Sequence, residues 1–153
     1  MSQPFSLRRR VAFSETDLAG IVHFSNILRY AEDAEHAFFR SLGHSVKPRP
    51  GDGRSLGYPR LKAAFRFFSP LRFEEEFEVR VLVREVRERS LTYGFEIHAL
   101  GDAEPRLCAR GTMTAVCVEG VGTGKVVAVP IPSGLRAKLE VAPEEAFLGW
   151  DEG

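Results

Sequence analysis

The amino-acid sequence predicts an α+β fold in which a single long helix faces an antiparallel sheet. Three observations support this prediction: an alternating segment near the N-terminus, one long amphipathic segment after it, and several alternating segments joined by turns in the rest of the chain. A chain of 153 residues is long enough to bury one core. We therefore treat residues 1–153 as a single domain.

The N-terminal segment has apolar residues at most odd positions between Phe5 and Phe13, and mostly polar residues between them. Arg9 is the one exception to this pattern. A period of two predicts a half-buried strand, because successive side chains of a strand point to opposite faces of the sheet.

The next segment repeats apolar and small residues at steps of three and four, which is the spacing of one helix face. These residues are Ile27, Tyr30, Ala31, Ala34, Ala37, Phe38 and Leu42. Gly43 follows as a natural C-terminal stop. We predict a helix over about residues 25–42, and its alanines are small enough to let the backbone lie close to a sheet.

A Pro- and Gly-rich loop at residues 44–59 precedes further alternating segments, which predict strands. The predicted strands cover about residues 60–69, 72–87, 91–99, 107–117 and 125–129, and a short helix follows Pro132. In the strand at 72–87, the shared apolar face consists of Phe73, Phe77, Val79, Val81 and Val83.

Composition argues against several functional classes. The 21 basic residues balance the 21 acidic ones, so nucleic-acid binding has no global electrostatic support. Cys108 and Cys117 are too few for a disulfide framework, and neither they nor His36, His44 and His98 have the spacing of a metal site. We expect no metal and no cofactor.

Localisation and phosphate binding can be judged in the same way. The first ten residues contain no leader-like apolar stretch, and no window approaches the roughly 20 apolar residues of a membrane span. We therefore expect a cytoplasmic protein with no membrane partner. The glycines of Gly120–Lys125 lack the spacing of a phosphate-binding loop, and they predict a turn instead.

The stretch Phe13–Asn26 joins the first predicted strand to the long helix, and it places the carboxylate of Asp17 near a helix N-terminus. The unpaired N–H groups and the dipole of a helix start stabilise a developing oxyanion. A neighbouring carboxylate can attack a carbonyl held there, or deprotonate a water that does. The alternative is that Asp17 only shapes the turn through side-chain hydrogen bonds.

The run Thr16-Asp17-Leu18-Ala19-Gly20-Ile21-Val22-His23-Phe24-Ser25-Asn26 resembles the signature of the 4-hydroxybenzoyl-CoA thioesterase family. This family belongs to the acyl-CoA thioesterases with the hot-dog fold, a long central helix wrapped by a curved antiparallel sheet. The similarity continues through the helix to Phe68-Ser69-Pro70-Leu71 and Arg89-Ser90, so it covers most of residues 5–118.

The resemblance implies that Asp17 is the catalytic nucleophile or general base, and that the backbone N–H near Phe24 polarises the thioester carbonyl. Gly20 would permit a tight backbone approach, and His23 would line the acyl pocket or bind the carbonyl. A histidine that merely packs at the helix entrance is the alternative for His23. The family further implies a homodimer or homotetramer with active sites at the subunit interface.

The resemblance also implies that Arg87, Arg89 and Ser90 hold the nucleotide end of coenzyme A, since guanidinium groups and hydroxyls suit phosphate. An ordinary solvated turn is the alternative. The predicted helix carries Glu32, Asp33 and Glu35 at positions where a related group of hot-dog thioesterases has its catalytic carboxylate. Because Asp17 already occupies the loop, we interpret these three as helix-face charges.

The predicted reaction is hydrolysis of an acyl-CoA or aryl-CoA thioester. Thiolate is a good leaving group, so one carboxylate and oriented donors can suffice. A non-catalytic acyl-CoA-binding module and a hot-dog hydratase are the competing functions; a binder does not need Asp17, and the loop resembles thioesterases more closely than hydratases. The acyl group, 4-hydroxybenzoyl, naphthoyl or a short to medium chain, stays open, as does the choice between an anhydride intermediate and direct attack by water.

Overall fold

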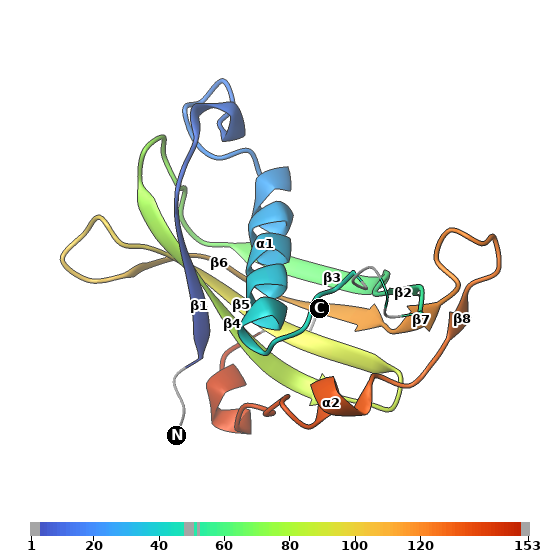
Figure 1. Cartoon of the computed structure of the whole chain (residues 1–153). Coiled ribbons are helices and arrows are strands. Elements are labelled where there is room, and N and C mark those ends of the chain that lie inside the picture. Colours follow the sequence, from blue (N-terminus) through green and yellow to red (C-terminus); the bar gives the residue numbers. More distant parts are fainter. Residues whose placement is uncertain (1–3, 48–50, 52, 151–153) are drawn as a thin grey trace. The chain divides into compact units, whose positions relative to one another are not determined.

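A computed structural model describes residues 4–47, 51 and 53–150 (Figure 1). The chain divides into two compact units. The first comprises Met1–Phe38, Phe65–Val81 and Phe95–Gly111, and the second comprises Phe39–Ala64, Leu82–Gly94 and Thr112–Gly153.

Five strands form one sheet in the order β1-β4-β5-β6-β3. Their bounds are Phe5–Arg10 for β1, Arg60–Phe67 for β3, Glu76–Val86 for β4, Ser90–Ala99 for β5 and Arg106–Val116 for β6. The first pair is antiparallel, with Phe5 opposite Val81 and Arg10 opposite Glu76. One long helix and this sheet confirm the predicted α+β fold.

Helix α1 comprises Ser25–Ser41 (Figure 1), and within the first unit its aromatic residues pack on strands β1 and β4. The Tyr30 ring lies 4.5 Å from the ring of Phe77 on β4, and the Phe38 ring lies 5.6 Å from that of Phe5 on β1. Tyr30 and Phe77 are fully buried, as are the small residues Ala31 and Ala34. The helix therefore has the position and the extent that its sequence period predicts.

The first and third predicted strands are shorter than their alternating patterns. β1 ends at Arg10, and Phe13 begins a 3-10 helix (Phe13–Glu15) in which its side chain is 76% exposed. Phe73 is also exposed, because it lies in the turn before β4, where Glu74 has a φ of 66°. These two exposed aromatic residues continue the alternating apolar pattern of the sequence past the ends of the strands. In the structure, the Phe13 and Phe73 rings pack against each other edge to face, with centroids 5.8 Å apart.

The second unit contains a small sheet in the order β2-β7-β8. Its strands are Leu56–Gly57, Val118–Glu119 and Val127–Ala128, so β2 lies within the predicted loop at 44–59. Residues 48–50 and 52 of that loop are outside the described residues. The predicted Gly-rich bend at 120–124 is confirmed as a turn over residues 121–124, and the helix predicted after Pro132 is confirmed as α2 (Ser133–Arg136).

Two side chains are more buried than their sequence context suggests. The sequence predicts that Glu35 is a helix-face charge, but it is 0% exposed, whereas Glu32 and Asp33 are exposed. His98 lies on β5, and its buried Nδ1 has no hydrogen-bond partner among the residues that the structure describes. Burial and the charge of Arg80 lower the pKa of His98.

Among the described residues, the helices are too short or too polar to cross a membrane.

Candidate active site

The residues from Thr16 to Val22 form a miniature hairpin within the first unit. Thr16 pairs with Val22, and the Asp17 N–H donates to the Ile21 carbonyl at 2.8 Å. The Gly20 N–H donates to the Asp17 carbonyl at 3.0 Å, and Gly20 has a φ of 76°, which glycine adopts without steric cost. This backbone closure fixes the position from which the Asp17 side chain projects.

The Asp17 carboxylate is exposed and only partly engaged. Its Oδ1 accepts the Ala19 N–H at 2.8 Å, which is the turn-shaping bond expected of an aspartate. Among the residues that the structure describes, Oδ2 accepts no hydrogen bond. The turn-shaping role and a free carboxylate oxygen therefore coexist in one side chain.

The second arm of the hairpin is anchored to a distant segment. The Val22 N–H donates to the Leu71 carbonyl at 2.8 Å, and Ile21 pairs with Arg72. Val22 and Leu71 are both buried. The loop that carries the Asp17 carboxylate therefore pairs with residues 71–72 through backbone contacts, as a short antiparallel strand would.

The start of α1 leaves one backbone donor open. The carbonyls of His23 and Phe24 accept the N–H groups of Asn26 and Ile27, while the His23 N–H donates to Glu15. The Phe24 N–H has no acceptor within the described part of the chain. It lies at the positive end of a 17-residue helix, where an added oxygen ligand is stabilised.

The side chains of the loop that leads to this donor include exposed apolar groups. His23 stacks on Phe24 with ring centroids 4.6 Å apart, and its Nδ1 lies 2.8 Å from the Ser25 hydroxyl. Phe24 is 66% exposed and Leu18 fully so. An ordered backbone with exposed apolar and carboxylate groups can bind an ester and act on its carbonyl.

Glu15 supports the whole loop, and the sequence reasoning did not identify it. Its carboxylate accepts the Ala12 N–H at 2.8 Å, the Tyr30 hydroxyl at 2.9 Å and the Arg9 guanidinium at 3.0 Å. Its carbonyl accepts both the His23 N–H and the side-chain amide of Asn26. Burial is the main cause that raises the pKa of Tyr30, and the hydrogen bond to Glu15 raises this pKa further.

One signal for this network was present in the sequence. Arg9 breaks the alternation of the first strand, because its side chain occupies an inward position and contacts Glu15, Asp33 and the Tyr30 ring. A charge at an apolar position of a strand indicates a partner on the covering element.

The predicted coenzyme A contacts Arg87, Arg89 and Ser90 belong to the second unit. The Arg87 N–H donates to the Ser90 carbonyl, and the Arg89 carbonyl accepts the Cys117 N–H at 2.7 Å. Both arginine side chains are exposed, and Arg87 pairs with Glu85 at 2.9 Å. Arg136 donates to the Arg87 carbonyl. The structure brings these three residues together at one turn.

A model of the thioesterase-like superfamily matches residues 11–139, well over half of the chain. The chain belongs to this superfamily. The match contains all seven predicted site residues, and membership confirms the thioesterase prediction at the level of the superfamily.

Individual relatives agree with this assignment. A protein of Aquifex aeolicus, provisionally named an esterase, is 33% identical over 127 residues, which cover 83% of this chain and 92% of that protein. A 1,4-dihydroxy-2-naphthoyl-CoA hydrolase of Thermosynechococcus vestitus is 27% identical over 139 residues, 91% of this chain and 90% of the relative.

A solved structure of 4-hydroxybenzoyl-CoA thioesterase with 4-hydroxybenzoyl-CoA has the same fold. The TM-score is 0.77 at 18% identity, and the superposition covers 89% of this chain and 98% of that one. The hot-dog fold is therefore confirmed.

Proposed function

We propose that this protein hydrolyses an acyl-CoA or aryl-CoA thioester to the free acid and CoA, with Asp17 as nucleophile or general base. The observation that carries the proposal is that one short, anchored loop carries both a partly free carboxylate, at Asp17, and a backbone N–H without an acceptor among the described residues, at Phe24. Membership in the thioesterase-like superfamily supports the reaction class.

The chemistry requires only these groups and water. The Phe24 N–H would donate to the thioester carbonyl oxygen, where negative charge develops during attack. Asp17 would either attack the carbonyl carbon, forming an anhydride that water opens, or remove a proton from the attacking water. In both routes the carbon–sulfur bond breaks, and CoA leaves as a thiolate that takes up a proton.

The remaining predicted residues would bind the substrate. Gly20 would keep the loop backbone close to the substrate, and His23 would contact the acyl group from its exposed position beside Phe24. Arg87, Arg89 and Ser90 would bind CoA phosphates. The relatives named for naphthoyl-CoA and 4-hydroxybenzoyl-CoA make aromatic acyl groups the first substrates to test.

We further infer that the functional form is a homodimer or homotetramer of this single-domain chain. Large apolar side chains are exposed in the loop and the first turns of α1, at Leu18, Phe24 and Leu28, and also on the edge strand β3, at Leu61 and Phe67. Contact between copies would bury such groups. A mass of one chain by light scattering at assay concentration would contradict this inference. A cytoplasmic location stays a prediction from the sequence, as does the absence of a cofactor.

The deciding experiment measures release of CoA thiol from aromatic and aliphatic acyl-CoA esters by the native protein and two carboxylate variants. Asp17→Asn keeps the side-chain shape and the oxygen that accepts the Ala19 N–H, but removes the charge. We expect kcat to fall by about two or more orders of magnitude.

Glu32→Gln is the matched control, because Glu32 is an exposed carboxylate on α1. Its kcat should stay within about twofold of native. Loss of turnover in Glu32→Gln and not in Asp17→Asn would move the carboxylate role to the helix. Tight acyl-CoA binding without turnover by the native protein would instead identify a binding module.

A further inference from the structure

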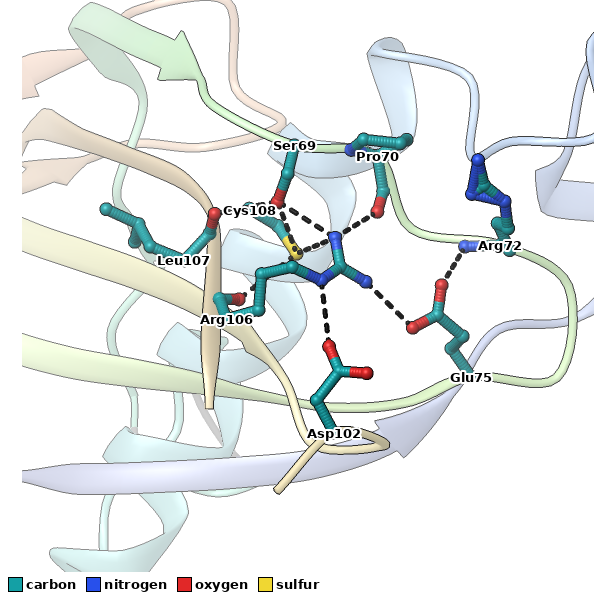
Figure 2. Close-up of polar contacts among 8 residues, drawn as sticks. All are labelled: Ser69, Pro70, Arg72, Glu75, Asp102, Arg106, Leu107 and Cys108. Carbon is teal, nitrogen blue, oxygen red and sulfur yellow. Dashed lines mark hydrogen bonds and ion pairs between the residues drawn. The ribbon is translucent and has the colours of Figure 1, made fainter. Parts of the chain in front are cut away.

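Arg106, the first residue of β6, connects three segments of the first unit (Figure 2). Its guanidinium donates to the Ser69 hydroxyl at 2.9 Å, the Pro70 carbonyl at 2.8 Å, Glu75 at 2.9 Å and Asp102 at 3.2 Å. Each of the three guanidinium nitrogens therefore has at least one oxygen partner.

The segment that Arg106 holds is the one on which the Asp17 hairpin is anchored. Pro70 directly precedes Leu71, whose carbonyl accepts the Val22 N–H. The other carboxylate oxygen of Glu75 accepts the Arg72 N–H at 2.8 Å (Figure 2). Arg72 in turn pairs with Ile21. Contacts of Arg106 thus lie on both sides of the two residues that support the loop.

The charges and the acceptor positions around Arg106 require the donor geometry of an arginine. Glu75 and Asp102 face a single guanidinium, whose planar set of donors reaches both carboxylates and a carbonyl at once. An ammonium group supplies charge at one point and cannot reproduce the fork. The Arg106 and Glu75 side chains are only 32% and 24% exposed, so solvent screens this pair less than an open surface pair.

We infer that Arg106 is a positioning residue for the thioesterase reaction: it holds residues 70–75 in the geometry that fixes the hairpin carrying Asp17. The inference rests on the proposed function for its catalytic consequence. Its structural part, the coupling of Arg106 to the hairpin, does not depend on turnover.

The structural part is tested by amide hydrogen exchange in Arg106→Met, measured residue by residue by NMR. The amides of Asp17 and Val22 should exchange about tenfold faster or more, because their acceptors are no longer held in place. The Cys117 amide, bonded to Arg89 in the second unit, should keep its rate. Equal acceleration of all three amides, or of none, would overturn the inference.

Arg54→Met is the matched control, since Arg54 pairs with Glu119 at 3.1 Å and, within the described residues, forms no hydrogen bond or ion pair with the hairpin or with residues 70–75. It should leave the Asp17 and Val22 exchange rates unchanged. Acceleration in this variant equal to that in Arg106→Met would also overturn the inference.

The catalytic part is tested with the acyl-CoA substrate on which the native protein is most active. Arg106→Met should lower kcat about tenfold with KM within about twofold, and Arg106→Lys should recover part of the loss. In the Asp17→Asn background, Arg106→Met should have little further effect, because both changes act on one group. Full additivity, or a native kcat in Arg106→Met, would overturn the positioning role. Absence of turnover in the native protein would refute the proposed function alone, and the exchange rates would still decide the coupling.

Discussion

The loop from Glu15 to Asn26 and the turn from Arg87 to Ser90 differ in how their polar groups are used. In the loop, a partly buried carboxylate and a series of backbone bonds fix the chain, and Asp17 projects from a closed hairpin. At the turn, the guanidinium of Arg87 is exposed and pairs with an exposed neighbour, Glu85. A fixed geometry suits directional chemistry at a carbonyl, whereas exposed cations suit capture of a mobile phosphate group.

The largest expected effect compares one carboxylate from each region. Glu15→Ala removes the acceptor for Tyr30, Arg9 and the Ala12 N–H, and it should lower the free energy of unfolding by about 2–3 kcal/mol. Glu85→Ala removes only an exposed ion pair and should change the free energy of unfolding by about 0.5 kcal/mol or less. Urea unfolding measures both variants, and equal values would contradict the contrast between the two regions.

A smaller effect tests the turn as a phosphate site. Arg87→Ala and Arg89→Ala should each raise KM for an acyl-CoA ester about tenfold, equivalent to about 1.4 kcal/mol, with kcat nearly unchanged. The control is the same acyl group on N-acetylcysteamine, which lacks the nucleotide. KM for this short thioester should be the same in native and variant proteins. An equal rise in KM with both substrates would show that the turn does not bind the nucleotide.

The smallest effect concerns the hairpin backbone. Gly20→Ala places a Cβ at a φ of 76° and should cost about 1 kcal/mol of unfolding free energy, although no atom lies within 4 Å of the new carbon. Gly101→Ala is the control, because Gly101 also has open space and no positive φ. It should be neutral or slightly stabilising. Thermal unfolding of the two variants would reveal identical shifts if backbone conformation were irrelevant.

Much of the fold was predictable because helix and strand periods are local properties of the chain. The period of three and four residues that ends before Gly43 predicts α1 within about one residue. Alternation in β4 and β5 likewise identifies the buried residues Phe77, Val79 and Tyr93. Phe13 and Phe73 were misassigned because an exposed aromatic ring in a turn extends an apolar period without belonging to the strand.

The candidate site likewise contains residues that the sequence predicted and residues that it did not. Asp17, Gly20, His23 and Phe24 lie within one short run, so their proximity follows from the chain itself. Arg106 was not found, because its partners Glu75 and Ser69 lie 31 and 37 residues away in the sequence. Glu35 could not be recognised as buried, since the helix face on which it lies depends on what covers it.

By itself, the sequence determined where the helix and strands lie, which loop carries the exposed carboxylate, and the family whose signature that loop resembles. These features depend on residues close together in the chain. Only the tertiary structure decided that Ile21 and Val22 pair with residues 71–72, that Arg9 and Tyr30 meet on Glu15, and that Arg106 holds the supporting segment. Each of these contacts joins residues far apart in the sequence, and such contacts form only when the packed core brings their segments together.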